Sequence, residues 1–161
     1  MTRTEFTQRA ERYKDMIFRI ALNYYANPHD GDDTLQEVLL RLYSCKKEFQ
    51  SEEHVKAWLI RVTINQCKNG LRQKKQRSWV SLEDADQPVQ FQFPEQSELY
   101  REVMALPEKY RTVLYLFYYE ELSVSEIADV LHLSTTAVTT RLSRARQQLK
   151  TNLTEVWKDE E

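Results

Sequence analysis

The sequence predicts an all-α protein of two small helical domains joined by an acidic linker, with a helix-turn-helix in the second domain. The chain of 161 residues has only two glycines and four prolines, and it is rich in Leu, Glu, Gln, Lys and Arg, which favour helices. Apolar residues recur at helical spacing along most of it. Residues 78–94 lack this periodicity and contain acids and prolines without Lys or Arg. We therefore expect domains at residues 1–77 and 95–157, although length alone also allows a single ordinary domain.

Three helices are expected in the N-terminal domain. The first spans residues 3–26 and stops at Asn27 and Pro28. The second spans residues 30–44, and its buried stripe consists of Leu35, Val38, Leu39 and Leu42. A loop leads to the third helix, at about residues 53–75, whose core face consists of Ile60, Ile64, Cys67 and Leu71.

The C-terminal domain is expected to begin with a helix near residue 95, followed by a second helix that Pro107 opens. A third short helix, SVSEIADVL, is separated by His132–Ser134 from a final helix at about residues 135–156. Two helices joined by such a tight turn have the pattern of a helix-turn-helix.

The caps of these two helices are predicted from five residues. Ser123 and Glu126 have the spacing of a capping box, and Leu122 with Ile127 has that of a hydrophobic staple. Ser134 is the expected N-cap of the final helix. The start of each helix is therefore defined by local sequence.

The final helix is expected to present a polar face. Its core residues are Val138, Leu142, Ala145 and Leu149, and its outward residues are Thr136, Thr140, Ser143, Arg144 and Gln147. Hydroxyls, amides and guanidinium groups bond phosphates or base edges when such a helix enters the major groove. The alternative is an amphipathic helix with a merely solvated face.

The third helix of the N-terminal domain has a basic face. Arg61, Asn65, Lys68, Arg72 and Lys75 recur at helical spacing on it, and Asn69 lies near. Three aromatic residues that are suited to base stacking flank the basic stretch: Phe49, Trp58 and Trp79. Two alternatives stay open: the basic residues form a solvated face instead of a DNA-binding one, and Trp58 belongs to the core instead of stacking on a base.

The net charge of −2 hides a segregation of charge along the chain. Residues 61–77 and 130–154 contain Lys and Arg without any acid, whereas residues 78–98 contain acids without Lys or Arg. Two basic stretches separated by an acidic one favour a nucleic-acid partner for each basic stretch.

Other classes of protein are disfavoured. The N-terminus is charged and no apolar run of about 18 residues occurs, so we expect neither a signal peptide nor a membrane span. We therefore expect the protein to be cytoplasmic and to make no membrane contact of its own. Cys45 and Cys67 form no metal-ligand motif and are expected to be buried free thiols. Because His29, His54 and His132 are scattered and no phosphate loop or nucleophile motif occurs, neither an enzyme, a metal nor a cofactor is expected.

Three segments together resemble the extracytoplasmic-function (ECF) sigma factors of the sigma-70 family. They are DDTLQEVLLRLY, AWLIRVTINQCKNGLRQKKQR and ALPEKYRTVLYLFYYEELSVSEIADVLHLSTTAVTTRLSRARQQL. The resemblance implies a non-enzymatic protein that directs bacterial RNA polymerase to stress-response promoters. It implies that KEFQSEEH is the loop that captures a flipped promoter base, and that the acidic linker runs through the RNA exit path.

The resemblance also implies partners and sites. The partners are core RNA polymerase, through its β′ coiled coil and β flap, promoter DNA and an anti-sigma factor. The implied polymerase-binding residues are Asp33, Gln36, Glu37 and Arg41. The implied contacts to the minus-10 element are Arg61, Asn65, Lys68, Asn69, Arg72 and Lys75. The implied contacts to the minus-35 element are Thr136, Thr139, Thr140, Arg141, Ser143, Arg144 and Gln147.

Three residues depart from the family pattern, and two other functions stay open. Thr139 stands where the family often has Lys, His132 where the turn often has Gly, and Gly70 interrupts the basic helix at a cost of about 1 kcal/mol relative to Ala. The main alternative is a dimeric helix-turn-helix regulator that binds an operator without polymerase. The other is a scaffold whose helical face binds another protein.

Overall fold

The computed structural model describes residues 1–25, 27–77 and 98–159, and the chain divides into two compact units, Met1–Phe91 and Gln92–Glu161. Every regular element among the described residues is a helix, so the predicted all-α class is confirmed. The segment 78–94, which we expect to be the linker, lies outside the described residues, as does Trp79.

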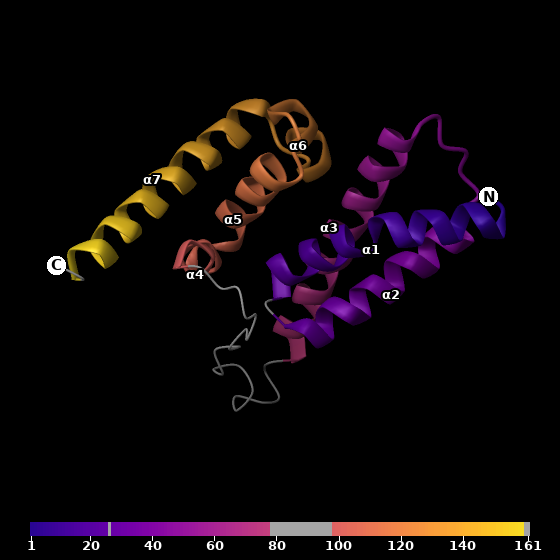
Figure 1. The fold of residues 1–161 in the computed structure, drawn as a ribbon, viewed down its shortest axis with the longest axis horizontal. Coiled ribbons are helices and arrows are strands. Elements are labelled where there is room, and N and C mark those ends of the chain that lie inside the picture. Colours follow the sequence, from indigo (N-terminus) through magenta and orange to yellow (C-terminus); the bar gives the residue numbers. More distant parts are fainter. Residues whose placement is uncertain (26, 78–97, 160–161) are drawn as a thin grey trace. The chain divides into compact units, whose positions relative to one another are not determined.

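The first unit is a group of three helices. They are α1 (Arg3–Tyr25), α2 (Pro28–Ser44) and α3 (Glu52–Arg77), and each contacts the other two (Figure 1). Their apolar faces meet in a core whose fully buried members include Ile17, Ile20, Val38, Leu42, Leu59, Ile60 and Ile64. Burial of each such side chain contributes about 1.5–3 kcal/mol, so this core holds the outward faces of α2 and α3 in place.

The start of α2 differs from the prediction. Asn27 and Pro28 were expected only to end the first helix, but Pro28 is the first residue of α2 and Asn27 is its N-cap. The Asn27 side chain accepts a hydrogen bond from the His29 backbone N–H at 2.9 Å. Proline suits this position because its missing N–H has no helical partner there. The same two residues therefore separate α1 from α2 and begin α2.

Both glycines lie where helices approach closely. A Cβ atom on Gly31 of α2 would lie 2.9 Å from Cε2 of Phe18 on α1. A Cβ atom on Gly70 of α3 would lie 1.7 Å from the hydroxyl oxygen of Tyr25. Gly70 is therefore required by the position of Tyr25, a reason that the sequence alone does not reveal.

The second unit contains α4 (Glu98–Ala105), α5 (Glu108–Leu114), the π-helix η1 (Tyr115–Tyr119), α6 (Val124–Leu131) and α7 (Thr135–Asp159). Helices α4, α5 and α6 all contact α7, which is the longest of the unit (Figure 1). The residues that fill its core include Leu106, Val113, Leu116, Ile127, Val138 and Ala145.

The segment after Pro107 was expected to be one helix, but its second half is the π-helix η1. The Glu120 backbone N–H bonds the carbonyl of Tyr115 at 3.2 Å, which closes a wider turn than an α-helix has. This turn buries Leu116 and stacks the rings of Tyr115 and Tyr119, whose centroids are 5.2 Å apart. The helix predicted after Pro107 therefore changes from an α-helical to a π-helical turn at Tyr115.

Candidate nucleic-acid and protein interfaces

The helix-turn-helix is formed by α6 and α7, and its local sequence signals are present as predicted. Ser123 and Glu126 make a reciprocal capping box, with both hydrogen bonds at 3.1 Å. The Ser134 hydroxyl accepts from the Ala137 backbone N–H at 3.0 Å and so caps α7. Leu122 and Ile127, the expected staple, are both buried. These contacts fix where α7 begins relative to α6.

The turn between α6 and α7 depends on a left-handed residue. His132 has φ 56° and ψ 44°, and its backbone N–H bonds the carbonyl of Ala128. A residue with a Cβ atom is strained in this region, and glycine is not. His132 carries a Cβ atom, so the turn is formed at a conformational cost.

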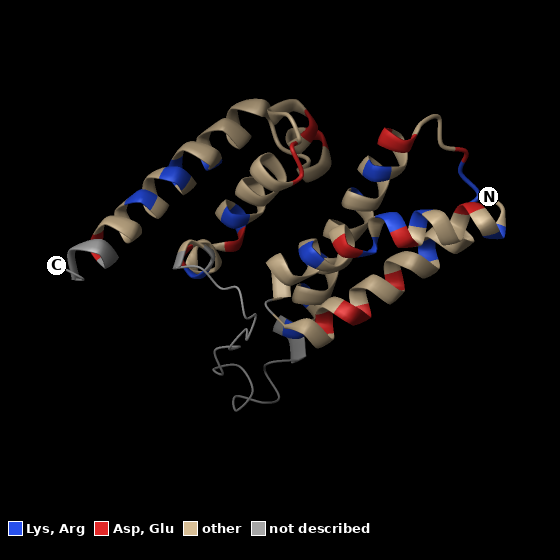
Figure 2. Ribbon diagram, viewed as in Figure 1, with Lys and Arg blue, Asp and Glu red and all other residues tan. Residues whose placement is uncertain are grey.

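Helix α7 presents the expected polar face to solvent. Val138, Leu142 and Ala145 are buried against the rest of the unit. Six of the seven candidate minus-35 residues are exposed: Thr136, Thr139, Thr140, Ser143, Arg144 and Gln147. Arg141 is half-buried. Figure 2 shows Lys and Arg along α7 with acids largely absent from its length.

Sequence reasoning counted Arg146 only as part of the basic stretch, but the structure gives it a specific environment. Its Nε atom donates to the hydroxyl oxygen of Tyr118 at 2.6 Å. Its guanidinium carbon lies 5.5 Å from the ring centre of Phe117 and 5.4 Å from that of Tyr118. Arg146 therefore attaches α7 to η1, and no signal in the sequence links residues that are 28 positions apart.

Helix α2 carries an exposed acidic face. All four candidate protein-binding residues, Asp33, Gln36, Glu37 and Arg41, are exposed. Figure 2 shows acids concentrated along this helix. Two large apolar residues that sequence reasoning did not select are also exposed, Leu40 at 61% and Tyr43 at 65%. The signal for Leu40 was available, since it lies off the buried stripe of α2. We call this surface, from Asp33 to Tyr43, the α2 face.

Helix α3 separates a core face from a basic face. Ile60, Ile64 and Cys67 are fully buried, whereas Asn65, Lys68, Asn69 and Arg72 are exposed and Arg61 is half-buried. The side chain of Lys75 lies outside the described part of the chain. Cys67 is thus a buried thiol as expected, but Cys45 is only half-buried.

The loop before α3, residues 45–51, is held by an aromatic cluster. The ring of Phe49 lies edge-to-face with Trp58 at 5.5 Å and with His54 at 5.3 Å between centroids. The guanidinium of Arg9 lies 5.3 Å from the centre of the same ring. Trp58 is half-buried in this cluster, so it packs against the loop rather than standing free as a stacking platform.

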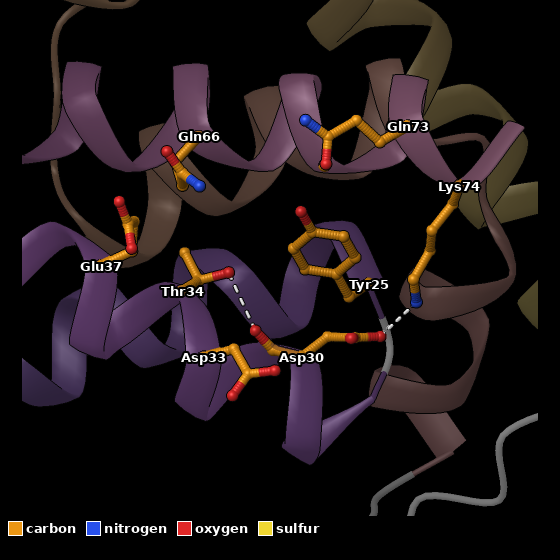
Figure 3. Close-up of a pocket in the computed structure, with 9 residues that line it drawn as sticks. Tyr25, Asp30, Asp33, Thr34, Glu37, Gln66, Gln73 and Lys74 are labelled. Atoms are coloured by element: carbon orange, nitrogen blue, oxygen red, sulfur yellow. Dashed lines mark hydrogen bonds and ion pairs between the residues drawn. The ribbon is translucent and has the colours of Figure 1, made fainter. Parts of the chain in front are cut away.

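A pocket of about 250 Å³ lies between α2 and α3 (Figure 3). Acids from α2, including Asp33 and Glu37, line one side, and Gln66 and Gln73 from α3 line the other. Lys74 forms an ion pair with Asp30 at its end. The α2 face and the basic helix therefore adjoin at this pocket.

Tyr25 lies at the same pocket and donates a hydrogen bond to the carbonyl of Cys67 at 3.2 Å. Burial, together with the nearby Cys67 and Asp30, raises the pKa of the Tyr25 phenol to about 12. The ammonium of Lys74 lies 5.2 Å from the centre of its ring. Tyr25 is therefore a neutral packing residue at neutral pH.

Features of other classes of site are missing from the described residues. Within residues 1–25, 27–77 and 98–159, no group of three His, Cys, Asp or Glu side chains is placed to hold a metal ion. No helix in the same ranges is long and apolar enough to cross a membrane.

Comparisons with known families and proteins match both units. A family model described as Sigma-70 region 2 matches residues 10–77, and one described as Sigma-70, region 4 matches residues 96–149. The ECF RNA polymerase sigma factor SigW of Bacillus subtilis is 28% identical over 167 residues, which cover 92% of this chain and 88% of that protein. The ECF RNA polymerase sigma factor SigM of the same organism is 29% identical over 149 residues, covering 87% and 90%.

Two solved structures share the fold. The sigma factor RpoE from Bartonella quintana, crystallised with the anti-sigma factor NepR, matches with a TM-score of 0.74 at 20% identity, over 93% of this chain and 97% of that one. CnrH, solved with the cytosolic domain of CnrY, matches with a TM-score of 0.67 at 22% identity, over 96% and 90%.

Proposed function

The chain belongs to the sigma-70 family, and from this premise we propose how its surfaces direct promoter-specific initiation by core RNA polymerase. The observation that carries the proposal is the order of three surfaces in one chain. An exposed acidic helix, α2, is followed by a basic helix, α3, and then by a helix-turn-helix with a polar outer face. A protein that only binds an operator needs the last of these but not the first two.

The α2 face is the proposed contact to polymerase. Exposed carboxylates at Asp33 and Glu37 attract a basic partner, and charge complementarity of this kind sets orientation and the rate of encounter. Leu40 and Tyr43 add apolar area that is otherwise in water. Exposed acids along the first half of α2 and exposed apolar side chains toward its end match a protein partner better than DNA, whose phosphates these acids repel. The resemblance to ECF sigma factors supports the β′ coiled coil as the proposed partner of this face.

Helix α3 and the loop before it are the proposed reader of the minus-10 element. Lys68 and Arg72 are placed to neutralise phosphates, while the amides of Asn65 and Asn69 suit base edges. Because α3 packs its other face into the core, these side chains are presented by a rigid element. Arg61 and Lys75 complete the proposed set at its two ends.

Helix α7 is the proposed reader of the minus-35 element. Hydroxyls at Thr136, Thr139, Thr140 and Ser143 and the amide of Gln147 suit both phosphates and bases. Arg144 and Arg141 provide the positive charge, and Arg144 is the exposed one. The capping box fixes α6, and α6 with the turn fixes how α7 enters the groove.

The two DNA readers are proposed to act together only on polymerase. Residues 1–77 carry the polymerase and minus-10 contacts, residues 95–157 carry the minus-35 contacts, and residues 78–94 join them. Linking two weak modules raises the effective concentration of the second once the first is bound. Neither module then needs high affinity, and the acids between them disfavour binding of the free protein to nonspecific DNA.

Further consequences follow for regulation and location. One solved relative is bound to an anti-sigma factor, and we propose such a partner for this chain, competing with polymerase for the α2 face. The site of action is the cytoplasm, where core polymerase is found. The chain performs no chemistry of its own in this scheme, because RNA synthesis belongs to the polymerase.

The test is in vitro transcription with bacterial core polymerase that lacks any other sigma factor, on a library of genomic promoter fragments. We expect transcripts that depend on this protein and share two upstream elements at fixed spacing. Glu37→Lys should abolish binding to core, whereas Arg144→Ala should leave core binding intact and weaken only promoters with the minus-35 element. If core is not bound while the free protein binds a palindrome as a dimer, the proposal fails and the chain is an operator-binding regulator.

A further inference from the structure

The start of α3 has an unusual cap. The Ser51 hydroxyl accepts a hydrogen bond from the His54 backbone N–H at 3.1 Å, as an N-cap serine does. In return, Nδ1 of His54 accepts from the backbone N–H of Gln50 at 3.2 Å. Glutamate or glutamine ordinarily makes the return bond at this position, and it reaches the N-cap amide itself. Here a histidine reaches one residue further back, into the loop.

The His54 ring also contacts the side chain of Phe49 in the loop of residues 45–51. It lies edge-to-face on Phe49, and Phe49 in turn contacts Trp58 and Arg9. The same residue therefore restrains two successive loop positions, the ring of Phe49 and the backbone of Gln50. The Gln50 backbone N–H is thus the donor and Nδ1 of His54 the acceptor in this bond.

The end of the loop nearest the helix is attached by contacts that do not involve His54. Glu52, the first residue of α3, forms ion pairs with Arg9 and Arg12 of α1, at 3.7 Å in each case. Its carboxylate also accepts from the hydroxyl of Tyr13 at 2.9 Å. These bonds fix where α3 begins but do not reach Gln50. Among the contacts described, the hydrogen bond that fixes the Gln50 backbone is the one to His54.

We propose that His54 is a positioning residue for promoter recognition: it sets the conformation of residues 45–51 so that the exposed Gln50 side chain and its neighbours meet an unpaired minus-10 base. This inference rests on the proposed function, in which that loop helps to read the minus-10 element, and on the capture of a flipped base that the resemblance to ECF sigma factors implies for it. His54 acts through the loop and contacts no DNA itself. Ordering the loop before binding removes part of the entropy that capture would otherwise cost.

Three substitutions separate the two contacts of His54. His54→Asn keeps an acceptor, because Oδ1 of asparagine is as many bonds from Cα as Nδ1 of histidine, but it loses the ring. His54→Phe keeps a ring against Phe49 and loses the acceptor. His54→Ala loses both. All three are assayed as holoenzyme assembled from the full chain and core polymerase, on forked DNA with an unpaired minus-10 element.

The hydrogen bond should carry most of the effect, because Phe49 is also held by Trp58 and Arg9. We therefore expect His54→Ala and His54→Phe to weaken binding of the forked DNA about fivefold, the effect of one lost hydrogen bond, and His54→Asn to stay within about twofold of the wild type. Affinity for core and for duplex minus-35 DNA should not change. On probes that carry a single abasic site, the defect should disappear at the captured position and persist at the others. In the free chain, the Gln50 amide should exchange with solvent faster in His54→Ala and His54→Phe than in the wild type or His54→Asn.

The outcomes distinguish this inference from the function on which it rests. If wild-type holoenzyme fails to bind forked DNA, the proposed function fails and the role of His54 falls with it. If the wild type binds and His54→Ala binds equally well, only the positioning role is refuted. The role is also refuted if His54→Asn is as weak as His54→Ala, or if the defect is the same on every abasic probe.

Discussion

For the replacement of Gly70 by alanine, helix propensity and packing predict opposite changes in stability. Considered only as a helix position, Gly70→Ala should stabilise the protein by about 1 kcal/mol, because glycine is the poorer helix former. In the structure, the new Cβ atom would lie 1.7 Å from the hydroxyl oxygen of Tyr25 and 2.9 Å from its Cζ. The phenol must then move, and its hydrogen bond to the Cys67 carbonyl must break.

The structure therefore predicts the opposite sign. Displacing a packed ring costs about 1–3 kcal/mol and losing its hydrogen bond costs about 1 kcal/mol more. The gain in helix propensity offsets only about 1 kcal/mol, so the net loss should be about 1–3 kcal/mol in the free energy of unfolding. In a Tyr25→Phe background, Gly70→Ala should cost less than in the wild type, since the nearest clashing atom is gone.

Urea unfolding of the full chain measures this difference. Trp58 lies in the unit that contains Gly70, so its fluorescence, in a chain with Trp79 and Trp157 replaced by phenylalanine, reports on that unit. The control is Ser44→Ala, an exposed substitution at the last residue of α2, which should change stability by no more than about 0.5 kcal/mol. A Gly70→Ala chain more stable than its parent would refute the close approach of Tyr25 to α3.

Four further predictions address other elements. Ser123→Ala should lower the free energy of unfolding of the second unit by about 1 kcal/mol in thermal unfolding, because it removes the capping box; no change would contradict the cap. His132→Gly should raise it by up to about 1 kcal/mol, since the residue has φ 56°, and destabilisation would argue against a left-handed turn. Arg144→Ala should reduce the slope of log K against log salt for minus-35 DNA by about 1, and an unchanged slope would remove Arg144 from the phosphate contacts. Raising the pH through 10 to about 12 should destabilise the first unit, because the folded state holds the Tyr25 proton more tightly than the unfolded state does. The stability that this proton contributes is complete below pH 10 and is lost toward pH 12. Tyr25→Phe should remove that part of the pH dependence.

Elements with a local signal were predictable from the sequence. The capping box at Ser123 and the N-cap at Ser134 depend on residues a few positions apart, and both are present in the structure. The predicted apolar stripe of α7 is buried at Val138, Leu142 and Ala145, and Leu149 at its end is half-buried. Exposure of most of the proposed contact residues followed from the same periodicity, whereas Arg61 and Arg141 are half-buried and the side chain of Lys75 lies outside the described part of the chain. The binding roles of these residues remain predictions, since exposure permits contact but does not demonstrate it.

Features that depend on tertiary contacts were not predictable. The π-helix η1 has no local signal in the sequence, and the Arg146–Tyr118 bond joins residues 28 positions apart. Gly70 was read as a cost to the helix because the clash it avoids is with Tyr25, on another helix. The second restraint on the loop, through His54, was missed because a histidine at that position does not match the usual capping pattern.

The most direct test of the central claim is a hydroxyl-radical footprint of one promoter, taken with the free chain, with core polymerase alone and with both. We predict protection of separate minus-10 and minus-35 elements only when chain and core are present together. Chains with Glu37→Lys should give no footprint, and chains with Arg144→Ala should lose the minus-35 part first. Protection of a palindromic site by the free chain, unchanged when core is added, would contradict the account.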